Sequence, residues 1–429
     1  MKYINSLDFA KSLDKKDPLG KFRKKFLFPK HKGKDVLYFT GNSLGLQPAT
    51  VKKYIEAELD DWAKYAVEGH FEARNPWYSY HEMFAAPLAK LIGAKPIEVI
   101  AMNQLTVNLH LMMVSFYRPT KSRYKIICES NAFPSDQYAI QTQVELHGLD
   151  RNKAIIEIKP RKGENLIGKE DILKAIEDNG NELALVIIGG VGYLTGQLMD
   201  MATITKAAHK VGAYCAFDLA HAAGNVEMKL HDWNVDFAVW CTYKYLNSGP
   251  GAVAGAFIHE KHIKNQKMPR LGGWWGYDKN TRFQMNKEFV PMKTAEGWQL
   301  SNAPVFSMAA HKAALDIFTE AGGMAPLCNK SRLLTGYLEF IISELNRKIK
   351  NKKVKLEIIT PTDPLQRGCQ LSIIAHGMGR EFYNTLTKNG VFCDWRNPNV
   401  VRMAPVPLYN SFEDIWKFGQ VVEQVLDLK

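Results

Sequence analysis

The sequence lacks the features that mark several protein classes. Its cysteines are few and scattered, at Cys128, Cys215, Cys241, Cys328, Cys369 and Cys393. No two of them form a CxxC pair, so neither a metal site of the zinc type nor a disulfide framework is expected. No apolar run reaches the roughly 18 residues that a membrane span requires, and the first residues lack the apolar segment of a signal peptide. We therefore expect a soluble, cytoplasmic protein with no metal and no membrane partner.

The charge is unbalanced and local. The chain has 429 residues, 46% of them hydrophobic, and a formal net charge of +12. Much of the excess lies in the N-terminal arm, at Lys15, Lys16, Lys21, Arg23, Lys24, Lys25, Lys30, Lys32 and Lys34. The arm lacks the regular aromatic residues of a stacking platform for nucleic acid. A solvated basic surface is favoured, and a nucleic-acid-binding protein stays as an alternative of a different class.

The middle of the chain alternates between apolar strand-like runs and helical segments. The expected strands cover residues 125–128, 154–158, 183–188, 213–217, 237–241 and 252–258. This alternation predicts an α/β fold with a mainly parallel sheet that helices cover on both faces. Residues 1–80 are expected to form an N-terminal arm with helices, 81–305 the large sheet domain, and 306–429 a smaller α+β domain. The arm is expected to pack with the C-terminal part.

Two short motifs follow strand-like runs and carry groups suited to chemistry. Asp218 and His221 lie in Phe-Asp-Leu-Ala-His, and Tyr243 and Lys244 lie in Thr-Tyr-Lys-Tyr-Leu-Asn. Lys244 follows Asp218 by about one strand–helix–strand step. An Asp that holds a pyridine nitrogen and a Lys that forms a Schiff base are what pyridoxal phosphate chemistry needs. Either residue alone is more often a helix cap or a surface charge, so the combination carries the prediction.

A phosphate site and a ring-stacking site are also expected. Residues 103–108, Asn-Gln-Leu-Thr-Val-Asn, open an apolar helix whose first-turn amides, with the Thr106 hydroxyl, suit a phosphate. Phe133 begins Phe-Pro-Ser-Asp after the strand 125–128, and its ring can stack on a pyridine. The alternatives are an ordinary helix cap and a loop aromatic that fills a core gap.

Longer motifs resemble the kynureninase family, pyridoxal phosphate enzymes of fold type I in the aspartate aminotransferase superfamily. The longest is FDLAHAAGNVEMKLHDWNVDFAVWCTYKYLNSGPGAVAGAFIHEKH, at 217–262. Others follow in the same order as in the family: FTGNSLG at 39–45, AMNQLTVNLHLMMVSFYRP at 101–119, FPSDQYA at 133–139, YLTGQ at 193–197, GGWWG at 272–276, LSN at 300–302 and RNPNVVRMAPVPLYNSFEDIWKF at 396–418. The resemblance spans about 35–420, nearly the whole chain.

This resemblance implies a fold, a reaction and an assembly. The fold is the type I fold of pyridoxal-phosphate-dependent transferases, with a mainly parallel seven-stranded sheet and a smaller α+β domain. The reaction is hydrolytic Cβ–Cγ cleavage of L-kynurenine or 3-hydroxy-L-kynurenine, which gives anthranilate or 3-hydroxyanthranilate and L-alanine, in tryptophan degradation and NAD biosynthesis. The assembly is a homodimer, with Trp274 and Asn302 reaching the neighbouring subunit's site.

The resemblance also assigns roles to residues. Lys244 is similar to the Schiff-base lysine, Asp218 to the partner of the pyridine nitrogen, and Tyr243 to a proton relay near the phosphate. The residues similar to cofactor-binding ones are Leu105, Thr106, Phe133, Pro134, Ser135, Asp136, Asp218, His221, Tyr243, Lys244, Trp274 and Asn302. Those similar to substrate-binding ones are Arg402, for the α-carboxylate, with His70, Ser301 and Asn302. Gly189 departs from the family, because relatives often carry a hydroxyl residue there.

Substrate choice and reaction type have alternatives. His70, Ser301 and Asn302 match the eukaryote-type pattern, which is associated with 3-hydroxykynurenine, and a site built to bond a ring hydroxyl rejects a substrate without one. The alternative is that they hold the ring without choosing. Another fold type I enzyme, an aminotransferase or a cysteine desulfurase-like protein, is the runner-up. A desulfurase needs a mobile catalytic cysteine, for which Cys369 and Cys393 are the candidates.

Overall fold

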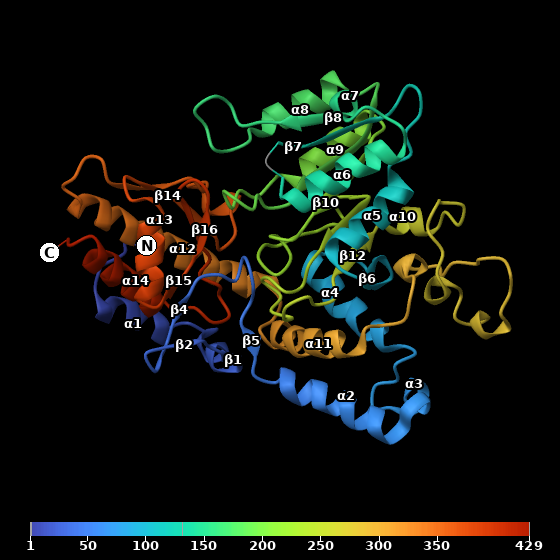
Figure 1. Ribbon diagram of the computed structural model, residues 1–429, viewed down its shortest axis with the longest axis horizontal. Coiled ribbons are helices and arrows are strands. Elements are labelled where there is room, and N and C mark those ends of the chain that lie inside the picture. Colours follow the sequence, from blue (N-terminus) through green and yellow to red (C-terminus); the bar gives the residue numbers. More distant parts are fainter. Residues whose placement is uncertain (1, 131, 429) are drawn as a thin grey trace.

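A seven-stranded sheet forms the centre of the chain. The computed structural model describes residues 2–130 and 132–428, and the strand order is β6-β12-β11-β10-β9-β7-β8 (Figure 1). These strands are β6 (Val99–Ala101), β7 (Lys125–Glu129), β8 (Ile155–Ile158), β9 (Leu183–Gly189), β10 (Tyr214–Asp218), β11 (Phe237–Trp240) and β12 (Gly255–Ile258). Strand β12 runs antiparallel to both of its neighbours, β11 and β6, and the other adjacent strands of this sheet are parallel. The predicted mainly parallel α/β sheet is therefore confirmed. Strand β6 was not expected from the sequence, because its three residues are too few to show a hydrophobic pattern.

The sheet is buried on both faces. Leu185 and Ile187 of β9 belong to one core, together with side chains of α5 (Leu105–Phe116) and α6 (Pro134–Leu146). Val186 and Ile188 belong to a second core on the other face. That core includes side chains of α4 (Ala85–Ile92), α8 (Lys169–Asp178), α9 (Met201–Lys210) and α11 (Val305–Glu320). Burial on both faces explains why the strands appear in the sequence as continuous apolar runs.

A second, antiparallel sheet lies in the C-terminal part, with the order β13-β14-β17-β16. Its strands are β13 (Lys355–Ile358), β14 (Leu371–His376), β16 (Asp394–Arg396) and β17 (Val400–Met403), and the helices of this part are α12 (Met324–Lys348), α13 (Gly379–Lys388) and α14 (Phe412–Val425). The beginning of the chain packs here: α1 (Leu7–Lys15) contacts α14, and β4 (Leu37–Tyr38) pairs with β15 (Val391–Phe392). Both termini therefore lie beside this sheet (Figure 1).

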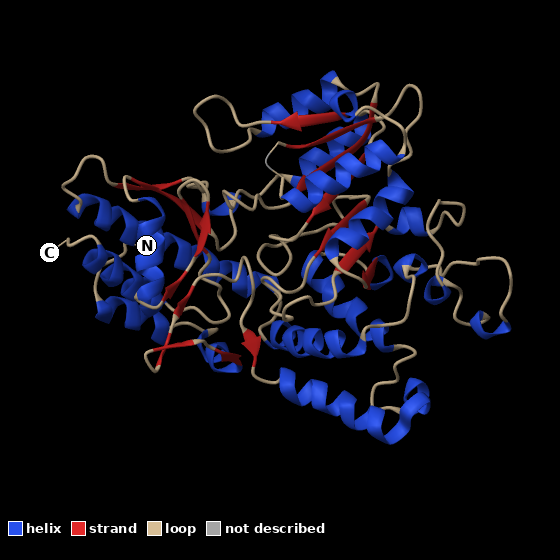
Figure 2. Cartoon of the chain, in the orientation of Figure 1, coloured by secondary structure: helices blue, strands red, loops and turns tan. Residues whose placement is uncertain are grey.

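Two further segments flank the central sheet in the sequence: a helical one before β6 and an irregular one after β12. Helix α2 (Val51–Tyr65) packs against α11 and leads to α3 (Gly69–Glu72). The segment after β12 is mostly loop (Figure 2), with short 3-10 helices at Trp274–Gly276, Arg282–Gln284 and Ala295–Trp298. The two segments meet where the ring of Tyr78 stacks on that of Phe283.

The remaining elements are short. They are β1 (Phe26–Leu27), β2 (Lys30–His31), β3 (Lys34–Asp35), β5 (Gln47–Pro48), α7 (Arg151–Ala154), α10 (Glu260–Ile263) and 3-10 helices at Gly20–Lys25, Ala66–Glu68, Tyr80–Phe84, Pro96–Glu98 and Pro364–Gln366. In the basic arm, Arg23 forms an ion pair with Asp414. Among the described helices, none combines the length and apolar character that crossing a membrane would take.

Candidate active site

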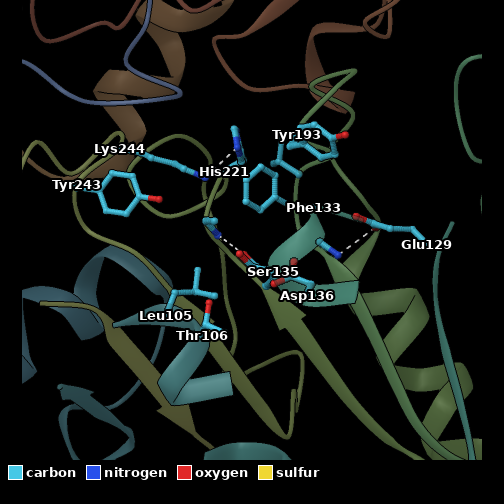
Figure 3. Close-up of a pocket in the computed structure, with 14 residues that line it drawn as sticks. Leu105, Thr106, Glu129, Phe133, Ser135, Asp136, Tyr193, His221, Tyr243 and Lys244 are labelled. Carbon is cyan, nitrogen blue, oxygen red and sulfur yellow. Dashed lines mark hydrogen bonds between the residues drawn. The ribbon is translucent and has the colours of Figure 1, made fainter. Parts of the chain in front are cut away.

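A pocket opens at the carboxyl ends of neighbouring strands of the central sheet (Figure 3). Glu129, Gly189 and Asp218 are the last residues of β7, β9 and β10, and Lys244 follows β11. The lining residues are Leu105, Thr106, Glu129, Phe133, Ser135, Asp136, Gly189, Val191, Tyr193, Asp218, Ala220, His221, Tyr243 and Lys244. Ligands of such sheets collect at this edge, and most of the predicted cofactor residues meet there.

The amine of Lys244 points at an imidazole. Its Nζ lies 3.1 Å from Nε2 of His221 (Figure 3), and 5.7 Å and 5.9 Å from the ring centroids of Phe133 and Tyr243. Burial, and then the charge of Lys244, lowers the pKa of His221 well below its usual value. The imidazole is therefore neutral and can accept a hydrogen bond from the amine.

Two carboxyl groups share the floor of the pocket. Burial raises the pKa of both Asp136 and Asp218. The charge of Asp218 further favours the protonated form of Asp136, whereas the charge of Lys244 favours the charged form of both groups. The backbone N–H of Ala220 also donates to Oδ1 of Asp218, at 2.6 Å. This backbone bond favours the charged form of Asp218, so Asp218 is the better placed of the two to act as a carboxylate.

Glu129 is a pocket residue that the sequence analysis missed. Its Oε2 accepts a hydrogen bond from the backbone N–H of Gly189 at 3.1 Å, and burial raises its pKa to about 7. A Cβ atom at Gly189 would lie 3.0 Å from Oε1 of Glu129, so glycine leaves room for this carboxyl group. The position itself was the available signal, because Glu129 ends a strand of a doubly wound sheet.

Two helices begin at the pocket without a side-chain cap. The N-cap residues of α5 and α6, Gln104 and Phe133, make no side-chain capping hydrogen bond. Thr106 lies in the first turn of α5, at the pocket wall. Pro134 is the first residue of α6 and is not in the pocket lining. Uncapped amides at a helix N-terminus suit a phosphate group.

These groups fit pyridoxal phosphate. The pocket offers an amine, a buried carboxylate, an aromatic ring and uncapped helix N-termini, which match its aldehyde, ring nitrogen, ring face and phosphate. In addition, Nδ1 of the buried His221 has no hydrogen-bond partner in the described part of the chain. A polar atom of this kind is costly unless a bound group satisfies it.

Arg402 lies behind the pocket wall. Its side chain is 1% exposed and is not in the pocket lining. The guanidinium bonds Asp394 through Nε and Nη2, at 3.3 Å and 2.8 Å, and the Tyr193 carbonyl oxygen through Nη1, at 2.7 Å. Because the Tyr193 side chain lines the pocket, Arg402 is one residue removed from it.

Four other predicted residues lie elsewhere. His70, Trp274, Ser301 and Asn302 line a separate hollow with Val67, Phe71, Tyr78, Trp275, Phe283 and Leu300. It shares no lining residue with the Lys244 pocket. Its wall is apolar and open: Val67, Phe71 and Phe283 are 72%, 55% and 57% exposed. One chain alone therefore does not bring these four residues to the lysine.

The two cysteines of the desulfurase alternative are inaccessible. Cys369 and Cys393 are both buried, and burial raises the pKa of Cys369 strongly and that of Cys393 to about 12. A buried, protonated thiol is a poor nucleophile. The structure therefore does not favour a desulfurase reaction at either residue.

The fold is similar to that of solved cysteine desulfurases. One from Thermococcus onnurineus is 18% identical, with a TM-score of 0.74 over 91% of this chain and 95% of that one. CsdA from Escherichia coli is 15% identical, with a TM-score of 0.76 over 96% and 98%. At such identities the likeness shows the fold alone, and it confirms the predicted fold class.

Sequence comparison identifies the family. Residues 37–360 match the aminotransferase class-V family, and 327–422 match the kynureninase C-terminal domain. Proteins named kynureninase are 56% identical in Flavobacterium psychrophilum (99% of both chains), 53% in Myxococcus xanthus (98% of this chain, 97% of the relative) and 51% in Nematostella vectensis (97% and 93%). Identity of this order over nearly the full length, on a fold whose pocket fits pyridoxal phosphate, places the chain in the kynureninase family, the pyridoxal-phosphate-dependent hydrolases of carbon–carbon bonds that its motifs predicted.

Proposed function

We propose that the enzyme hydrolyses the Cβ–Cγ bond of L-kynurenine and 3-hydroxy-L-kynurenine, giving L-alanine with anthranilate or 3-hydroxyanthranilate. The observation that carries this proposal is the meeting of Lys244, Asp218 and His221 in one pocket of a kynureninase-family chain. The direct test adds each kynurenine to the purified holoenzyme and follows anthranilate fluorescence and L-alanine. Absence of both products would contradict the proposal.

Each part of the cofactor would be held by a different residue of the pocket. Lys244 would bind its aldehyde carbon, Asp218 its ring nitrogen and Phe133 its ring face, while Thr106 and the first turn of α5 would hold the phosphate. When bound there, pyridoxal phosphate supplies an electron sink for the negative charge that develops at the substrate Cα. A charged Asp218 keeps that sink effective, because it favours a protonated ring nitrogen.

Lys244 and its neighbours would remove and donate protons during the reaction. The free amine of Lys244 is the base that removes the proton from the substrate Cα, and Nε2 of His221, 3.1 Å away, orients it. Tyr243 stands at the same wall, and burial raises the pKa of its phenol. The phenol therefore keeps its proton at neutral pH and can donate it to a reacting group.

The separate hollow supports a homodimer. Its apolar side chains, such as Val67, Phe71 and Phe283, are exposed in one chain, and large exposed apolar patches mark interaction sites. The hollow of one subunit would cover the Lys244 pocket of the other, so that His70, Trp274, Ser301 and Asn302 complete the neighbouring site. A symmetric pair of this kind forms two such shared sites.

Mixing two inactive variants tests the shared site. Lys244→Ala removes the amine, and Trp274→Ala alters the hollow. In a mixed dimer, one site carries both changes and the other carries neither, so co-expressed variants should regain about a quarter of wild-type activity. Activity no greater than that of the separate variants, or full activity from a monomer, would contradict the arrangement.

The hollow also supports a preference for 3-hydroxykynurenine. Nδ1 of His70 bonds the Val67 carbonyl oxygen at 3.0 Å, which leaves Nε2 as an acceptor for a phenolic hydroxyl. Asn302 offers a second polar group in the same hollow. A site that bonds the hydroxyl discriminates against the substrate that lacks it. The test compares kcat/KM for the two kynurenines in the wild type and in Asn302→Ala; a wild-type preference for the unhydroxylated substrate would contradict it.

A further inference from the structure

Asp394 stands between two arginines beside the pocket. It lies directly opposite Arg402 in the antiparallel pairing of β16 with β17. Its carboxylate contacts Nε and Nη2 of Arg402, at 3.3 Å and 2.8 Å. It also accepts a hydrogen bond from Nη2 of Arg396 at 3.2 Å and forms an ion pair with Nε of Arg396 at 2.9 Å. The hydroxyl of Ser43 donates to Oδ2 of Asp394 at 2.5 Å. Asp394 is thus fixed from two strands and from the N-terminal loop.

The charge of Asp394 is maintained by these contacts. Burial favours its protonation, but Arg402 and Arg396 together hold the pKa of this carboxyl below its usual value. Arg402 is 1% exposed, and a buried cation needs a fixed counter-ion. Asp394 provides it.

The short bonds of Arg402 engage the side edge of its guanidinium. A guanidinium has five N–H donors in a fixed fork. Asp394 occupies the side edge, formed by Nε and Nη2, and the Tyr193 carbonyl oxygen takes one N–H of Nη1. The other N–H of Nη2 makes only a long bond to Oγ of Ser43, at 3.4 Å. A carboxylate that displaced this long bond would meet the end edge, formed by Nη1 and Nη2, whose spacing suits a two-pronged contact.

We propose that Asp394 is a positioning residue. Its carboxylate binds the side edge of the Arg402 guanidinium, so that the end edge of the guanidinium receives the α-carboxylate of the substrate. This inference rests on the proposed role of Arg402. Tyr193 supports it, because its side chain lines the Lys244 pocket while its carbonyl oxygen holds Nη1. The guanidinium carbon lies 5.9 Å from the Tyr193 ring centroid. The guanidinium is therefore held next to the pocket wall.

Arg396 provides a matched control. It bonds the same carboxylate but is 35% exposed, and its side-chain hydrogen bonds to described residues go to Asp394 alone. Removing Arg396 therefore leaves the contacts between Asp394 and Arg402 in place.

The test uses the holoenzyme with Asp394→Asn, which removes the charge and one acceptor but keeps the shape. The KM for L-kynurenine should rise roughly tenfold, since a hydrogen bond to a charged group has about that effect. The kcat should change little, because Lys244 is untouched. Inhibition by L-alanine, which carries the α-carboxylate, should weaken in parallel. Inhibition by 2-aminoacetophenone, which lacks that group, should not, and Arg396→Gln should raise KM much less than Asp394→Asn does.

An unchanged or lower KM in Asp394→Asn would overturn the proposal, and a lower one would show that Asp394 competes with the substrate carboxylate. Should this variant not fold, Ser43→Ala removes one support of Asp394 and should raise KM by a smaller factor; no rise there would equally overturn it. Arg402→Lys distinguishes the proposed role of Arg402 from that of Asp394. A normal KM in Arg402→Lys contradicts the role of Arg402, whereas a raised KM there with a normal one in Asp394→Asn contradicts only the role of Asp394.

Discussion

The Nζ atom of Lys244 lies 3.1 Å from Nε2 of His221, a residue that stands 23 positions earlier at the end of the neighbouring strand. The imidazole is buried, and burial and the lysine charge lower its pKa well below the usual value. A neutral Nε2 accepts a hydrogen bond from the amine without taking its proton. The contact therefore fixes the direction of the amine.

His221→Leu removes this acceptor and keeps an apolar side chain in place. A hydrogen bond to a charged group contributes about 1.5–3 kcal/mol, so kcat should fall roughly 10- to 100-fold. KM should change less, because the α-carboxylate site is separate. His221→Gln, whose amide oxygen can accept a hydrogen bond, is the control and should retain more activity. Equal steady-state kcat values for the wild type and His221→Leu would contradict this role.

The Asp136–Asp218 pair predicts unequal effects of two identical substitutions. Burial and the charge of Asp218 raise the pKa of Asp136 and favour its neutral form, so Asp136→Asn replaces one neutral polar group by another. Asp218→Asn removes the charge that holds a protonated ring nitrogen, and loss of one member of a buried pair costs about 3–5 kcal/mol. We expect kcat to fall by roughly two orders of magnitude or more in Asp218→Asn and only modestly in Asp136→Asn. Similar kcat losses in both variants would show that the proton is not held as described.

The sequence predicts the fold and one half of the site for the same reason. Strands buried on both faces are continuous apolar runs, and the polar residues that follow them, such as Asp218 and Lys244, stand out by contrast. Strand-end position places both at one edge of the sheet. This rule needs no knowledge of side-chain contacts.

The other features depend on contacts that no local pattern encodes. Glu129 enters the pocket because Gly189, on an adjacent strand, has no Cβ to exclude it. Asp394 meets Arg402 only through strand pairing in the C-terminal sheet. His70 and Asn302 lie in a hollow that shares no lining residue with the Lys244 pocket. Tertiary pairing, which no local pattern encodes, determines these positions.

Glu129 predicts a pH dependence of stability. Its pKa is about 7 in the folded chain and near 4.5 in the unfolded one. Between these values the unfolded state loses the proton first, so this residue lowers the unfolding free energy as pH rises from about 4.5 to 7, by about 3 kcal/mol in total. Below that window both states are protonated, and above it both are charged. Glu129→Gln, which cannot ionise, should lack this loss.

The measurement compares the thermal midpoint of the apoenzyme with that of Glu129→Gln at pH 5 and pH 8. The variant should gain stability relative to the wild type at the higher pH. Glu157→Gln, which changes an exposed carboxylate on β8, is the control and should follow the wild type. A constant difference between the wild type and Glu129→Gln across this range would contradict the raised pKa of Glu129.

Gly45 connects the N-terminal loop to the segment that carries the lysine. Its backbone N–H donates to the carbonyl oxygen of Tyr243 at 2.8 Å. A Cβ atom at this position would overlap the carbonyl oxygen of Lys244 and both the Oδ1 and the Cα atoms of Asn247. Two of these contacts are with backbone, which cannot rotate away, so Gly45→Ala must displace the lysine segment.

A displacement of this kind should affect catalysis more than folding, because a 1 Å misplacement of a reacting group can cost about 100-fold in rate. We expect kcat in Gly45→Ala to fall by at least about tenfold, with near-UV circular dichroism retained. Gly20→Ala, in the same N-terminal region, is the control: its nearest neighbour, Oδ2 of Asp17, would lie 3.5 Å from the new Cβ, an ordinary contact, so kcat should be unchanged. Wild-type kcat in Gly45→Ala would mean that the lysine segment tolerates the methyl group and that the close approach of the N-terminal loop does not position Lys244.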